Sequence, residues 1–169
     1  MKLQFPGRHN ALNALAAAVV AHQAGISWDE CFSGLARFEG VDRRFQFRGE
    51  GKGVTFYDDY GHHPTEVRAV LEAFREKFPE QRLRVVFQPH RYSRTQSCWD
   101  EFLEVFSKVD EVLVLDIYPA GEAPITGVDG ENLSQQLKSK NGTYVKNFEQ
   151  AIEALTTDRQ SGDVVISLG

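Results

Sequence analysis

The stretch 111–121, EVLVLDIYPAG, decides the fold class of this 169-residue chain. Four apolar residues, Val112 to Leu115, follow one another without the polar alternation of a half-exposed strand. Such a run is typical of a strand with both faces covered, which is the usual position of strands in parallel sheets. Asp116 then ends the apolar run. The stretch therefore predicts a buried parallel strand that leads into a polar loop.

The segments around this strand alternate between the two hydrophobic periods. β-Branched and aromatic runs mark strands, and apolar residues at helical spacing mark helices. The expected strands are 54–57, 82–89, 111–121, 143–146 and 162–169, and the expected helices are 64–78, 97–109, 130–140 and 147–157. This order predicts an α/β fold with a doubly wound, mostly parallel sheet and flanking helices.

The first forty residues have a different pattern. An alanine-rich helix is expected from Asn10 to a stop at Gly25, and a second helix after Ser27, with Glu30 completing a capping box. Neither helix has a strand of its own to pack on, so this part looks incomplete as a domain. We predict a division into residues 1–40 and residues 41–169.

Composition excludes several classes of protein. The formal net charge of −5 argues against a nucleic-acid binder held by its overall field, although a local basic pocket remains compatible with it. No apolar run approaches the ~20 residues that cross a bilayer, and the start of the chain lacks the regions of a signal peptide. Cys31 and Cys98 stand alone, without zinc or disulfide spacing. No membrane or nucleic-acid partner is expected, and a reducing cytoplasm is the expected location.

Polar side chains gather where three of the expected strands end. The carboxyl ends of parallel strands meet at one edge of a sheet, and ligands bind beyond that edge. The three groups are Asp58, Asp59, Tyr60, His62 and His63; Gln88, His90, Arg91, Tyr92 and Arg94; and Asp116, Tyr118 and Glu122. We expect them to converge on one binding site.

The first group, within YDDYGHHPTE (57–66), allows three interpretations. Metal ligation by His62 and His63 is disfavoured, because adjacent histidines point in different directions and no standard zinc spacing is present. A structural interpretation has His63 packing on the following helix and Asp58 capping it. A third interpretation makes the stretch a pocket rim, with Asp59 facing a nucleotide, and we adopt it as the hypothesis.

The second group, within FQPHRYSRT (87–95), indicates an anion site. Arginine presents a planar fork that suits a carboxylate or a phosphate, and Arg91 and Arg94 follow a buried strand together with His90. The alternative is a solvated loop that leads into a helix capped by Ser97. The neighbouring carboxylates and imidazoles favour the binding site.

Five stretches together resemble the Mur ligases of peptidoglycan synthesis: PGRHNALNALAA, DRRFQ, DDYGHHPTE, FQPHRYSRT and DIYPAGEAPITG. They occur in the family's order and extend over nearly the whole chain. The resemblance implies an enzyme of three domains, of which this chain matches the end of the central ATPase domain (1–40) and the Rossmann-like C-terminal domain (41–169). Two helices of a truncated central domain would thus precede the doubly wound sheet.

The resemblance also implies a chemistry, namely ATP-driven formation of an amide bond through an acyl phosphate. L-alanine and UDP-N-acetylmuramate would be the substrates. The implied nucleotide contacts are His9, Asn10, Arg44 and Asp59; the implied alanine contacts are Tyr60, His62, His90, Arg91 and Arg94, with His62 also able to accept a proton from the amine.

No metal ligand is assigned to this chain, and the Mg²⁺ ligands are expected in the missing domain. The nearest approach to a phosphate loop, GEGKG at 49–53, lacks the Ser or Thr that should follow Lys52. We therefore expect a piece of an enzyme that is inactive alone. Two other hypotheses stay open, a stand-alone nucleotide- or amino-acid-binding module and a fragment without a ligand, and the sequence leaves the oligomeric state undetermined.

Overall fold

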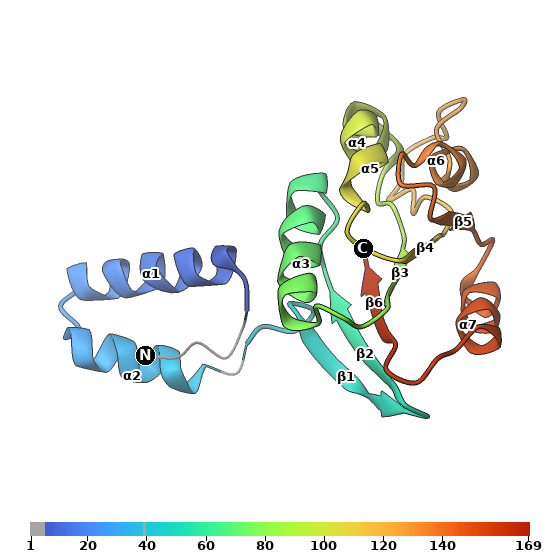
Figure 1. Ribbon diagram of the computed structural model, residues 1–169. Helices are drawn as coiled ribbons and strands as arrows, with labels where there is room; N and C mark the ends of the chain where they lie inside the picture. Colours follow the sequence, from blue (N-terminus) through green and yellow to red (C-terminus); the bar gives the residue numbers. More distant parts are fainter. Residues whose placement is uncertain (1–5, 39) are drawn as a thin grey trace.

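A computed structural model describes residues 6–38 and 40–169 and shows a six-stranded sheet with helices on both faces (Figure 1). The strands are β1 (Gln46–Gly51), β2 (Val54–Asp59), β3 (Leu83–Phe87), β4 (Glu111–Val114), β5 (Gly142–Tyr144) and β6 (Val164–Leu168). Their order is β1-β2-β6-β3-β4-β5, and all neighbours are parallel except β1 and β2. The helices are α1 (Arg8–Gln23), α2 (Trp28–Arg37), α3 (Pro64–Lys77), α4 (Tyr92–Ser97), α5 (Trp99–Val105), α6 (Gly130–Gln136) and α7 (Phe148–Thr157). The predicted α/β class and mostly parallel sheet are confirmed.

Strand β1 was not predicted from the sequence. It pairs antiparallel with β2 through a two-residue turn, in which Lys52 (φ 52°) and Gly53 (φ 80°) both have positive φ angles. Positive φ at both central residues is what a type I′ hairpin turn requires, and glycine supplies it without strain. The GEGKG stretch is therefore a hairpin connection, with the register shifted between Phe47 and Gly49.

One face of the sheet carries the main hydrophobic core. Helices α3, α5 and α6 cover it, and side chains from all three pack against the inward-facing residues of the strands (Figure 1). Phe74 of α3 is fully buried and stacks on Phe45 with ring centroids 3.9 Å apart. Tyr57 of β2 meets both rings edge-on. This aromatic group fixes α3, and with it the loop that precedes α3, against the sheet.

The opposite face is covered by α7 over β3 and β4. A smaller apolar cluster forms there from Val86, Leu113, Leu115, Val145 and Ala151. Of the residues of α7, Ala151 is the buried one. This helix therefore attaches to the sheet through little apolar area.

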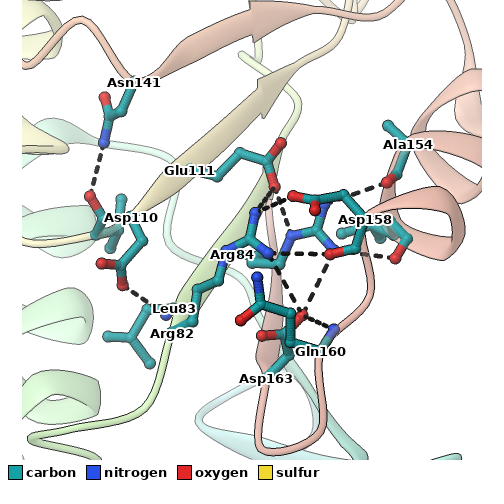
Figure 2. A network of polar contacts seen from close by, with 12 residues as sticks. Arg82, Leu83, Arg84, Asp110, Glu111, Asn141, Ala154, Asp158, Gln160 and Asp163 are labelled. Carbon is teal, nitrogen blue, oxygen red and sulfur yellow. Dashed lines mark hydrogen bonds and ion pairs between the residues drawn. The ribbon is translucent and has the colours of Figure 1, made fainter.

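A buried arginine supplies the second attachment of α7. Arg84 of β3 is 1% exposed, and its guanidinium lies at the centre of a polar network (Figure 2). It pairs with Glu111 of β4 (Nε–Oε2 2.5 Å) and with Asp163 (Nη1–Oδ2 3.6 Å). It also donates to the carbonyl groups of Ala154 and Leu155 near the end of α7. A positive charge is favourable at the carbonyl end of a helix, so Arg84 fixes α7 to the sheet.

Helices α1 and α2 lie to one side of the sheet, next to α3 (Figure 1). The predicted capping box is present, because Ser27 Oγ accepts from the Glu30 N–H and Glu30 Oε2 accepts from the Ser27 N–H. Much of α1 is exposed, including Leu15 and Val20. Within the described residues, none of the helices combines the length and apolar character needed to span a membrane.

Candidate functional site

Aromatic and imidazole rings from three strand ends meet beyond the carboxyl edge of the sheet. After β2, the rings of Tyr60 and His62 contact each other edge-on at 4.9 Å. The ring of His62 lies 6.1 Å from that of His90, which follows β3. His90 stacks on Tyr118, which follows β4, at 5.4 Å. The structure therefore brings these ends of β2, β3 and β4 together.

The guanidinium groups of Arg91 and Arg94 lie at the His90 end of this ring cluster. Arg94 Nη1 donates to the His90 carbonyl at 3.2 Å and lies 3.4 Å from His90 Nδ1. Arg91 takes a left-handed backbone conformation (φ 74°), which is strained for a residue with a side chain. The bond from its N–H to the carbonyl of Tyr118, 2.8 Å, holds that conformation. Burial, and then the charge of Arg94, lower the pKa of His90, so His90 is neutral near pH 7.

The segment after Arg91 is a helix, which corrects one sequence-based alternative. Residues 92–97 form α4, and Ser97 is its last residue. The hydroxyl of Ser97 donates back to the carbonyl of Arg94, so Ser97 does not cap the helix that follows. The helical turn places Arg91 and Arg94 close to His90, which a solvated loop would not ensure.

Glu122 fastens the loop after β4 to the start of α4. Its carboxylate accepts from the Ser93 N–H at 2.9 Å and from Ser93 Oγ at 2.6 Å. It also lies 3.9 Å from Arg91 Nη1. The bonds from Ser93 hold the pKa of Glu122 below its ordinary value, so the group is ionised at neutral pH. Asp116, expected at the same site, instead accepts from the hydroxyl of Tyr144.

The helix after the YDDYGHHPTE stretch is capped by His63. The Nδ1 atom of His63 accepts from the Thr65 N–H, and the N–H groups of His62 and His63 donate to Glu66. The predicted cap, Asp58, instead accepts from Arg43 and from Ser167. His63 therefore fixes the direction in which the chain leaves the site and enters α3.

A cleft of about 900 Å³ separates α1 and α2 from α3. Most of its wall is apolar, but its polar residues include several of those predicted to contact a nucleotide. The predicted contacts in its wall are His9, Asn10, Arg44 and Asp59, and Asn13 and Glu66 line it as well. The structure therefore brings the four predicted nucleotide contacts together, apart from the Arg94 cluster.

Asp59 is more buried than a rim residue should be. It is 2% exposed, and each carboxylate oxygen already accepts a backbone N–H at 2.8 Å, one from Phe45 and one from Gly61. Burial raises the pKa of Asp59, and these two bonds and the charges of Arg44 and His9 oppose that shift. Asp59 thus holds the loop between β2 and α3, and its contact with a nucleotide stays a prediction.

Two residues at the site were missed by sequence reasoning. Asn13 lies one helical turn after Asn10 and also lines the cleft, and that spacing was available as a signal. Arg43 places its guanidinium 4.8 Å from the Tyr60 ring centroid, while its Nε donates to Asp58. Nothing in the local pattern distinguishes Arg43 from Arg44.

The described residues include no group of three or more His, Cys, Asp or Glu side chains placed to hold a metal ion. The rings of His62 and His63 have different partners, since His62 Nδ1 lies 2.9 Å from the Tyr60 carbonyl and His63 Nε2 lies 3.7 Å from Cys98 Sγ. We therefore assign no metal ligand within these parts of the chain.

The fold and the site are those of an α/β domain of the kind whose ligands bind beyond the strand ends. Its mostly parallel sheet carries a basic cluster at that edge, and a largely apolar cleft with Arg44 and Asp59 in its wall lies beside α3. The family described as "Mur ligase, glutamate ligase domain" matches residues 43–169, and the chain belongs to the Mur ligase family.

Individual proteins show more specific similarities than the family as a whole. The chain is 57% identical over 167 residues to UDP-N-acetylmuramate–L-alanine ligase of Bdellovibrio bacteriovorus, covering 99% of this chain and 37% of that protein. A crystal structure of a UDP-N-acetylmuramate-alanine ligase from Thermotoga maritima is 27% identical, with a TM-score of 0.77, and the match covers 100% of this chain and 36% of that one. Folylpolyglutamate synthase of Mycobacterium tuberculosis, solved with ADP and AMPPCP, shares the fold at 19% identity and a TM-score of 0.72, covering 99% and 38%. The chain thus spans little more than a third of the length of these relatives.

Proposed function

We propose that this chain is the C-terminal part of an ATP-dependent ligase that joins L-alanine to UDP-N-acetylmuramate in peptidoglycan synthesis. The observation that carries the proposal is the placement of two arginines, Arg91 and Arg94, around a neutral His90 beside the rings of Tyr60 and His62. Two guanidinium groups at one strand edge suit the carboxylate of an amino acid. The 57% identical relative bears the name of that ligase.

The alanine would bind at the ring cluster. Arg94 donates to its carboxylate and Arg91 adds a second positive charge, while Tyr60 and His62 line the pocket. His62 is able to accept a proton from the incoming ammonium, which must become a neutral amine before it attacks an activated carboxyl group.

The nucleotide would bind in the cleft between α1 and α3. The residues fit it chemically: Arg44 suits a phosphate, Asn10 suits an adenine edge, and each oxygen of Asp59 keeps a lone pair for a ribose hydroxyl. ATP would supply the energy for the amide bond. The Mg²⁺ that accompanies ATP would be held by parts of the longer protein, as would the UDP-sugar. Because both described cysteines are free, we also propose a cytoplasmic location.

A chimera tests this function. The chain replaces the matching third of the Bdellovibrio ligase, and phosphate release is measured with ATP, Mg²⁺, UDP-N-acetylmuramate and varied L-alanine. We expect L-alanine-dependent turnover, and we expect Arg94→Ala to raise the KM for L-alanine about ten- to a hundredfold, the loss of one charge-assisted bond. The KM for ATP should stay within about twofold, because Arg94 lies outside the cleft lining.

The matched control is Arg48→Ala, which removes an exposed arginine of β1 that contacts Gln46. It should leave both KM values unchanged. If the Arg94→Ala chimera turns over with an unaltered KM for L-alanine, the alanine carboxylate does not bind at this site. The chain by itself is expected to release no phosphate.

A further inference from the structure

The charges around the ring cluster are not all of one sign. At the Tyr60–His62 end, Arg43 lies 4.8 Å from the Tyr60 ring and Glu66 lies 3.7 Å from His62. At the His90 end, Arg91 and Arg94 are the cations, and Glu122 is an ionised carboxylate 3.9 Å from Arg91. Arg94 has no carboxylate partner among the ion pairs of the described residues, and its bonds go to His90. The two arginines are therefore not equivalent, because one is paired within the protein and the other is not.

Glu122 holds its place independently of any ligand. Ser93 donates to it through both the N–H and the hydroxyl, and its own N–H donates to the Pro119 carbonyl at 2.9 Å. The side chain of Glu122 is 26% exposed and that of Arg91 50% exposed, so the pair lies at the solvent edge of the site. A fixed carboxylate in this position repels a second negative charge on a ligand.

We propose that Glu122 is a specificity-determining residue that restricts the site to ligands with a single carboxylate. At the His90 end of the ring cluster, Arg91, Arg94 and Glu122 together carry one net positive charge, which matches the carboxylate of a neutral amino acid. An acidic amino acid would bring its second carboxylate toward the region that Glu122 occupies. The inference rests on the proposed function, since it assumes that the arginines receive an amino-acid carboxylate.

The test uses the 169-residue chain itself, with acetate and malonate as probes at constant ionic strength. Binding is followed through the NMR shifts of the Arg91 and Ser93 amides and the Arg94 Nε–H group. In the wild-type chain, malonate should bind within about twofold of acetate, despite its second charge. In Glu122→Gln, the preference for malonate over acetate should rise about three- to tenfold, the effect of removing one nearby charge in a largely solvated site.

Two further variants separate charge from structure. Ser93→Ala removes the hydroxyl bond but keeps the Glu122 charge, and it should leave the preference for malonate unchanged. Glu104→Gln removes the same charge from an exposed pair with Lys138, and it should also leave the preference unchanged.

The outcomes distinguish this inference from the proposed function. If acetate fails to shift the Arg94 signals of the wild-type chain, the carboxylate site of the proposed function is wrong. If acetate binds and the wild-type chain already prefers malonate more than tenfold, the role of Glu122 is wrong and the site itself stands. The role of Glu122 is also wrong if Glu122→Gln leaves the preference for malonate unchanged. If that variant does not fold, the comparison of malonate with acetate in the wild-type chain still tests the inference.

Discussion

The two faces of the sheet are held by different forces. Helix α3 on the first face has six buried residues and packs aromatic rings against the sheet, whereas α7 on the second face has one buried residue and depends on Arg84. Apolar packing is non-directional and gains with buried area, while a buried ion pair is favourable only when its partners are all in place. Substitutions on the first face should therefore lower stability in proportion to the buried apolar area that they remove. On the second face, the loss of a single charged partner should already lower stability strongly.

The largest loss of stability is expected from Arg84→Met on the second face. The substitution removes the nearer cation from Asp163, itself 1% exposed, and leaves it only the more distant Arg82 at 4.0 Å and the N–H of Gln160. Breaking a buried pair in this way costs about 4 kcal/mol of unfolding free energy. Urea unfolding measures it, with Lys108→Met as the control, because the exposed Lys108–Glu72 pair contributes at most about 1 kcal/mol. If Arg84→Met costs no more than Lys108→Met, the second face does not depend on its ion pairs.

A smaller effect is expected from Leu71→Ala on the first face. Leu71 is 1% exposed, and truncating a buried leucine costs about 3 kcal/mol through lost burial and the cavity that remains. Ile152→Ala on α7 is the matched control, because that side chain is 62% exposed and should change stability by less than about 0.5 kcal/mol. Equal losses for the two variants in urea unfolding would contradict the contrast between the faces.

The smallest effect is the pH dependence that one ion pair of the second face adds to stability. The bond from Arg82 lowers the pKa of Asp158 below its ordinary value of 3.8. A carboxyl group with a lowered folded-state pKa contributes stability above that ordinary value, and the contribution is lost as pH falls through the folded-state pKa. The difference in Tm between the wild-type chain and Asp158→Asn should therefore be present at pH 6 and disappear in acid. Glu153→Gln, an exposed change on α7, should show no such pH-dependent difference.

The same contrast explains what the sequence could predict. The first face follows from local patterns, because residues such as Val67, Val70, Leu71 and Phe74 recur at helical spacing. Arg84 interrupts a strand that otherwise reads as fully apolar, and its partners Glu111 and Asp163 lie 27 and 79 residues away in the numbering. No local pattern connects residues so far apart, so the buried network was not predicted.

The features of the candidate site also divide into those that the sequence could predict and those that it could not. Parallel strands end at one edge, so the meeting of Tyr60, His62 and His90 followed from the strand assignments alone. The cap by His63 and the contacts of Glu122 with Ser93 depend on side-chain geometry that residue order does not specify. Asp59 was expected to face a nucleotide because an acid at the carboxyl end of a strand suits ribose hydroxyls. Its burial depends on two backbone N–H groups brought in by the fold, which residue order does not specify.

The hairpin strand β1 has a consequence for self-association. An uncovered β2 would present a regular ladder of unpaired N–H and C=O groups, on which a second molecule could extend the sheet. Strand β1 pairs with that ladder, and its own outer edge carries Arg48 and Glu50 and is bent by the register shift near Gly49. The opposite margin of the sheet is β5, with three residues. Short, charged and bulged edges disfavour strand-to-strand aggregation, so both margins of this sheet protect the protein at high concentration.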